Sequence, residues 1–124
     1  MIKASRLLKT PDSTLRIVKV FKEPYRKQVV VNSVQATTQP SPQVYIVKIQ
    51  SNTPTLKGTS EVKVSCDCHD FRYRCAYCLD QIDALMMEPS YLLTPPDKTN
   101  PGCKEIRACK HVSEALRFLI KNNY

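Results

Sequence analysis

Two short cysteine-containing clusters constrain this chain more than any other feature. Each places two metal-binding side chains one residue apart: Cys66 and Cys68 in the first cluster, Cys109 and His111 in the second. Three thiolates and one imidazole form a complete tetrahedral ligand set for Zn²⁺. If all four bind one ion, that ion fastens two distant stretches of a 124-residue chain together and becomes part of the fold.

The ligand set indicates a structural site rather than a catalytic one. Four protein ligands leave no coordination position open for a substrate. The alternative is that the cysteines are ordinary core residues, since a free cysteine behaves as a small hydrophobic side chain. We favour the metal, because the two pairs fall at the end of a strand-like run and at the start of a helix-like run.

Residues 14–65 carry the pattern of short strands joined by turns. The strand-like runs are rich in β-branched residues and are separated by proline-containing turn signals. They cover residues 15–21, 25–38, 44–50 and 61–66. In the last run, Val62, Val64 and Cys66 alternate with polar residues. We expect an antiparallel β-meander that buries this face, with Cys68 next on the same side.

Beyond the first cluster the pattern becomes helical. Residues 71–87 contain no Pro or Gly, and their apolar residues recur at steps of three and four. A second helix is expected from His111 to about Lys121, with an apolar stripe that includes Leu116 and a polar face that includes Ser113. The expected fold class is α+β: a small antiparallel β-meander, a zinc knuckle, a helix in the insert and a C-terminal helix.

The chain length predicts one domain, which we divide into three parts. Residues 1–13 are expected to form a basic N-terminal arm, and residues 14–124 a single zinc-stapled domain. That domain comprises the meander at 14–65 and the metal module at 66–124. No apolar run reaches the ~18–20 residues of a membrane span, and no secretory signal is readable. We therefore expect a reducing cytoplasm, where cysteines indicate metal or thiol chemistry before disulfides.

Positive charge is concentrated near the start of the chain. The formal net charge is +8, and residues 1–27 hold eight Lys or Arg against two acidic residues, which leaves +6 there. Such an excess favours a polyanion or an acidic protein surface. A solvated, solubilising face explains the charge alone equally well. The candidate polyanion contacts are Lys3, Arg6, Lys9, Arg72 and Arg74.

A second group of potential ligands lies inside the insert. It consists of His69, Cys75, Cys78 and Cys103. Two cysteines spaced as Cys-x-x-Cys occur in many zinc knuckles and redox motifs. A second metal site, a disulfide and free thiols all remain open for this group.

The clusters and the residues around them resemble the SWIM-type zinc finger. That signature is Cys-x-Cys, a long insert, and Cys-x-His at a helix start. The likeness extends to a group of small tailed-bacteriophage proteins, through Cys-Asp-Cys-His-Asp-Phe-Arg-Tyr-Arg at 66–74 and Thr-Asn-Pro at 99–101. His69 stands where those proteins usually have proline. The resemblance covers about residues 60–120 and implies one zinc ion held by a small β-element and a helix.

Three functions compete on this reading. The first is a non-enzymatic structural protein, a small virion or assembly component that docks on larger virion proteins and is found in the virion or the host cytoplasm. The second is a DNA-binding zinc finger module, which the net charge favours. An enzyme ranks last, because the metal ligand set is full and the sequence shows no catalytic triad, carboxylate pair or phosphate loop. We expect neither a membrane partner nor a small-molecule substrate.

Overall fold

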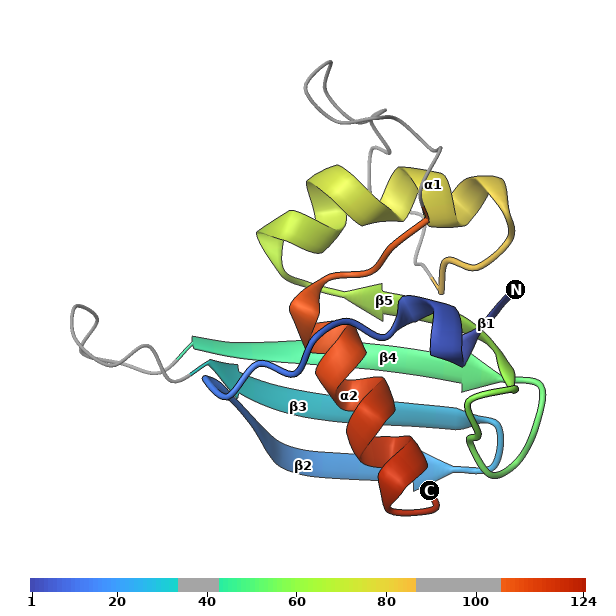
Figure 1. The fold of residues 1–124 in the computed structure, drawn as a ribbon, viewed down its shortest axis with the longest axis horizontal. Helices are drawn as coiled ribbons and strands as arrows, with labels where there is room; N and C mark the ends of the chain where they lie inside the picture. Colours follow the sequence, from blue (N-terminus) through green and yellow to red (C-terminus); the bar gives the residue numbers. More distant parts are fainter. Residues whose placement is uncertain (34–42, 87–105) are drawn as a thin grey trace.

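A single antiparallel sheet forms the centre of the molecule (Figure 1). The computed structural model describes residues 1–33, 43–86 and 106–124. Within these ranges the strands follow the order β1-β5-β4-β3-β2. Their bounds are β1 Ile2–Lys3, β2 Leu15–Glu23, β3 Arg26–Ser33, β4 Gln43–Ser51 and β5 Glu61–Cys66. The predicted meander corresponds to β2–β5, and the predicted α+β class is confirmed.

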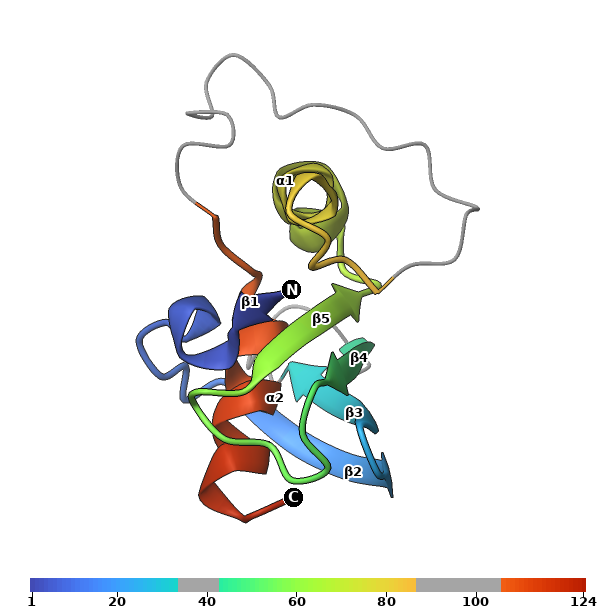
Figure 2. The ribbon, with the colours of Figure 1, turned by 90° about the vertical axis from the view of Figure 1, so that its right-hand side faces the viewer.

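The described helical segments flank this sheet. A 3₁₀ turn, η1 (Ala4–Leu7), follows β1, and a π-helical turn, η2 (Phe71–Cys75), leads into α1 (Ala76–Gln81). The last helix is α2 (Lys110–Lys121). α2 lies across one face of the sheet, whereas α1 lies beyond β5, away from the other strands of the meander (Figures 1 and 2).

The two faces of the meander differ in burial. Alternate residues of β3, β4 and β5 point toward α2 and are fully buried, as the two-residue period of a strand requires. The largest of them are Val29, Val31, Val47, Ile49, Val62 and Val64. The opposite face carries mostly polar and charged side chains that are exposed or half-buried.

The C-terminal helix completes the core. Its apolar stripe, predicted from the sequence, is buried against the sheet, with Leu116 and Leu119 fully covered. Ser113 departs from the prediction that it faces water, because it is buried and its Oγ accepts a hydrogen bond of 2.7 Å from the Lys9 backbone N–H. The segment around Lys9 crosses this side of α2 and covers Ser113, which the helical period had placed on the polar face.

The first residues belong to the sheet and the core. We expected a basic arm over residues 1–13, but Ile2 pairs with Val62 of β5. Ile2, Ala4 and Leu7 are buried, and the Ala4 N–H donates to the carbonyl of Ser60 at 2.8 Å. These three apolar residues within the first seven positions show no clear period, so the sequence allowed a short helix or a docking arm but did not identify β5 as the partner.

The helix in the insert is shorter than predicted. Instead of continuing through residue 86, α1 ends at Gln81, and Asp83 adopts a left-handed backbone with φ of 55°. Leu85 then forms a parallel bridge with Val64, where the Met86 N–H donates to the Val64 carbonyl at 2.9 Å. The edge of β5 beyond β1 offers these hydrogen bonds, and they override the helical period. Residue 87 lies outside the described residues.

Candidate metal centre

The first ligand pair is placed by the end of strand β5. Val62, Val64 and Cys66 share the buried face, and Cys68 is buried on the same side while Asp67 is exposed. This arrangement confirms the predicted orientation of the two thiols. The Asp67 carboxylate accepts a hydrogen bond of 2.9 Å from the Ile46 backbone N–H, so the chain just beyond β5 is tied to β4.

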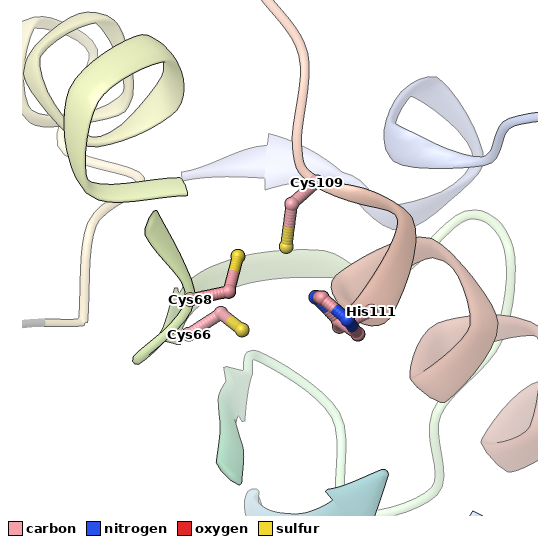
Figure 3. A group of neighbouring side chains, drawn as sticks. All are labelled: Cys66, Cys68, Cys109 and His111. Atoms are coloured by element: carbon pink, nitrogen blue, oxygen red, sulfur yellow. The ribbon is translucent and has the colours of Figure 1, made fainter. Parts of the chain in front are cut away.

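The second pair comes from the start of α2. Cys109 precedes the helix with an extended backbone, and its carbonyl accepts the first helical hydrogen bond, from the Ser113 N–H at 3.1 Å. His111 lies in the first helical turn. Both side chains point toward Cys66 and Cys68, and the four are drawn together in Figure 3.

The four side chains form one compact, buried group. One potential ligand atom from each of Cys66, Cys68, Cys109 and His111 lies within 4.8 Å of the corresponding atoms of the other three. All four residues are buried. Sulfur and nitrogen atoms that bind one central ion at about 2.0–2.3 Å would also lie this close to one another. The group could therefore hold one metal ion, as the spacing of the clusters predicts.

The backbone after Cys68 supports its sulfur. The Phe71 N–H donates to Cys68 Sγ at 3.3 Å, at the first residue of η2. The Phe71 side chain is buried in the same hydrophobic core as Cys68. Hydrogen bonds of this kind orient a metal-bound sulfur and stabilise its negative charge. The turn that follows the first cluster thus prepares Cys68 to act as a thiolate.

His111 supplies the clearest sign that something is bound here. Both ring nitrogens, Nδ1 and Nε2, are buried and have no hydrogen-bond partner among the described residues. A buried polar atom without a partner costs about 1–3 kcal/mol. An ion bound to one of these nitrogens removes the cost at that nitrogen. The Tyr45 ring packs against the imidazole, with ring centroids 4.2 Å apart.

The three thiols perturb one another strongly. Hydrogen bonds from Cys109 and then Cys66 lower the pKa of Cys68, so the first negative charge forms there. Burial, followed by the two neighbouring sulfurs, raises the pKa of Cys109. Two further thiolates would be costly at such short range without a compensating cation. A divalent ion supplies that charge, and it binds thiolates rather than thiols.

The second group of candidates does not form a comparable cluster among the described residues. His69 is exposed, whereas Cys75 and Cys78 are buried. Cys75 is a free thiol, and burial, followed by the Asp70 carboxylate, raises its pKa to about 12. Cys78 is disulfide-bonded, so the disulfide alternative holds for this residue, which is then not a metal ligand. Cys103 lies outside the described residues, and a second metal site that includes it stays a prediction.

The candidate polyanion contacts lie on the surface where the structure describes them. The side chains of Lys3, Arg6, Lys9 and Arg72 are exposed. The side chain of Arg74 lies outside the described part of the chain. Exposure agrees with a role in contacts but does not distinguish a polyanion from bulk solvent.

Two residues near the centre were missed by the sequence analysis. Tyr45 packs on His111, and Asp67 ties the first cluster to β4. Tyr45 shares a face with Val47 and Ile49, so the strand period alone places it on the buried side. The sequence carries no signal for its proximity to His111, because that depends on where α2 begins over the sheet.

Comparisons with protein-family models, with curated proteins and with solved structures find no match to this chain. None of the described helices is long and apolar enough to cross a membrane. The metal centre therefore has to be interpreted from its own geometry.

Proposed function

We propose that this protein is a non-enzymatic, structural zinc-binding protein of the SWIM type. The observation that carries the proposal is the buried group of three thiols and one imidazole, whose ligand atoms lie within 4.8 Å of one another. The sequence signature of the two clusters supports the choice of this finger type. The ion joins the end of β5 to the start of α2.

Zinc is the metal that best fits this set of donors. Thiolate and imidazole ligands in a tetrahedral arrangement select zinc over the hard cations, which prefer oxygen. With Cys66, Cys68, Cys109 and His111 all bound, no position remains for a substrate, so the proposed role of the ion is structural.

Native mass spectrometry of protein purified without added metal tests this assignment. We expect one zinc ion per chain, lost in Cys109→Ser and kept in Cys75→Ser. Cys75 makes a matched control because it is also a buried free thiol but lies outside the cluster. Protein without zinc, or equal zinc loss in both variants, would contradict the proposal.

We further propose a biological setting, a small virion or assembly component of a tailed phage that docks on larger virion proteins. The support is the sequence resemblance in residues 66–74, 99–101 and 109–111. The protein would be located in the virion or in the host cytoplasm, and purified particles should contain it at a fixed copy number if it is a virion component. Absence from washed particles and from assembly intermediates argues against this setting.

DNA binding is the second candidate, favoured by the net charge of +8. A protein that neutralises several phosphates loses affinity steeply as salt rises. Retention on duplex or single-stranded DNA at physiological salt, weakened when Lys3, Arg6 and Lys9 are neutralised together, would support this function. Release well below physiological salt would leave the docking role as the better account.

A further inference from the structure

The face of the sheet opposite α2 forms a groove that the metal centre does not explain. Its volume is about 820 Å³, and its lining comes from strands β2 to β5 and from Leu85 and Met86. α2 and the N-terminal segment lie on the other side of the sheet (Figure 2). A hollow of this size is comparable with small-molecule and peptide sites.

The strand register arranges this lining in three rows. Directly paired residues of β2, β3, β4 and β5 line up across the sheet, and neighbouring strands are about 4.8 Å apart. The central row is Phe21, Gln28, Lys48 and Ser65. The row on one side is Glu23, Arg26, Gln50 and Lys63, and Ile46 lies on the other side, next to Asp67.

Positive charge in the groove is only partly compensated. Lys63 forms an ion pair with Asp83 at 3.0 Å. Within the described residues, Arg26 and Lys48 have no ion-pair partner. Lys48 lies in the central row, and Arg26 lies at the start of the adjacent strand, paired in the strand register with Glu23; a negatively charged partner would complement the two cations.

Apolar side chains flank the same cations. Phe21 is 48% exposed and Ile46 is 37% exposed, both on this face. Lys19 lies over the Phe21 ring, 4.7 Å from its centroid. Exposed aromatic and aliphatic residues beside unpaired cations are typical of protein interaction sites.

The mixture of groups distinguishes a protein partner from a nucleic acid. Glu23 and Asp67 place carboxylates within the groove lining; they disfavour a phosphate backbone, which is charged at every nucleotide, whereas a peptide can place uncharged residues opposite them. A single-stranded nucleic acid also requires several stacking rings, and Phe21 is the aromatic residue of the described lining. The amide groups of Gln28 and Gln50 can pair with the backbone of an extended polypeptide.

We propose that this groove binds an extended acidic segment of a partner protein, with its carboxylates at Arg26 and Lys48 and an apolar side chain against Ile46. This inference rests on the proposed docking function and names the surface and the partner chemistry for it. The zinc centre lies at the end of β5 and positions the chain that borders the groove.

Selection from a random 12-residue peptide library on the zinc-loaded protein tests the inference. We expect enrichment of acidic sequences that contain one or two apolar residues. Binding of an enriched synthetic peptide should weaken about tenfold or more in Lys48→Glu. It should remain unchanged in Lys57→Glu, which reverses another exposed lysine that lies off this face. Ile46→Ser should weaken binding more than Ile82→Ser, because Ile46 lines the groove and Ile82 does not. Ile82 is a matched control, since both isoleucines are 37% exposed.

Several outcomes would overturn the inference. Selection without an acidic consensus, or a peptide that binds Lys48→Glu as well as the parent, rules out the groove. Oligonucleotides that bind the parent protein and compete with the peptide at Lys48 would assign the face to nucleic acid instead. Zinc content measured in every sample keeps the proposals separate: zinc without groove binding refutes only the inference, and groove binding without zinc refutes only the metal assignment.

Discussion

The strands β2 to β5 and the insert after Cys68 are held in place by different kinds of contact. The strands share continuous antiparallel ladders and bury alternate residues under α2. The insert meets the sheet through the Val64–Leu85 bridge, a few core side chains such as Phe71 and Leu79, and the group of metal-binding residues. The group that could hold a metal ion thus lies at the junction of the well-packed sheet with an insert whose described residues, 68–86, bridge to the sheet at Leu85.

The largest expected effect comes from loss of the metal. Cys109→Ser should release the ion and destabilise the insert and the start of α2 far more than the central strands. Structural zinc contributes about 10–16 kcal/mol of apparent binding free energy in zinc-finger peptides, which equals or exceeds the typical net stability of a domain. Hydrogen exchange should show lost protection in residues 68–86 before β3 and β4.

The matched control for this variant is Cys75→Ser, which keeps the cluster intact. It should retain the metal and lose only the packing of one buried thiol. Uniform loss of protection across the whole chain in Cys109→Ser would mean that the two regions unfold as one unit. That result would remove the distinction between them.

The second effect lies in the sheet region. Leu116 is fully buried on α2 against the strands, so Leu116→Ala should cost about 2–5 kcal/mol of unfolding free energy. We expect urea denaturation of the metal-loaded protein to shift in a single transition, with the metal content unchanged. Ile120→Ala, at a partly buried position on the same helix, should cost less. Equal costs would show that α2 is not packed as described.

The sheet was predictable because its residues carry a local period. Alternation at Val62, Val64 and Cys66 fixed both the strand and the direction of the first thiol. The metal ligands were predictable because their spacing is short within each pair, although the pairs are distant from each other. The ligand set needs only two local motifs, and an ion bound by all four residues would supply the long-range connection.

The features that were not predicted depend on contacts between distant segments. The end of α1 is set by an open edge of β5, and the burial of Ser113 by a backbone N–H at Lys9. β1 is two residues long and pairs with a strand about sixty positions later. Neither propensity nor periodicity encodes such partners, because they exist only after the sheet and α2 have come together.

A third effect concerns the thiol inside the insert. Burial raises the pKa of Cys75 from 9.0 to about 12, so the folded protein holds the thiol proton more tightly than the unfolded chain. The stabilising contribution is fully present below pH 9 and is lost between pH 9 and about 12. Each pH unit in that window removes at most about 1.4 kcal/mol.

Denaturation curves of the parent and of Cys75→Ala, recorded below pH 9 and within the window, measure this loss. The unfolding free energy of the parent should fall more steeply with rising pH than that of the variant. A constant loss of packing in the variant does not change this slope. Parallel pH profiles would indicate that Cys75 is accessible to water. They would also indicate that the insert is packed more loosely around Cys75 than the burial of this thiol suggests.

The smallest effect is expected at Tyr45, which connects strand β4 to the metal-binding group at His111. Its ring lies on the sheet strand β4 and packs on His111, 4.2 Å between centroids, while its hydroxyl donates to the Gln43 side chain away from the centre. Tyr45→Ala should weaken metal binding about tenfold, the low end for residues that orient a ligand. Tyr45→Phe keeps the ring and should leave metal affinity unchanged, as measured by competition with a chelator. If both variants bind metal like the parent, the imidazole is oriented by α2 alone, and the sheet contributes to the centre only through β5.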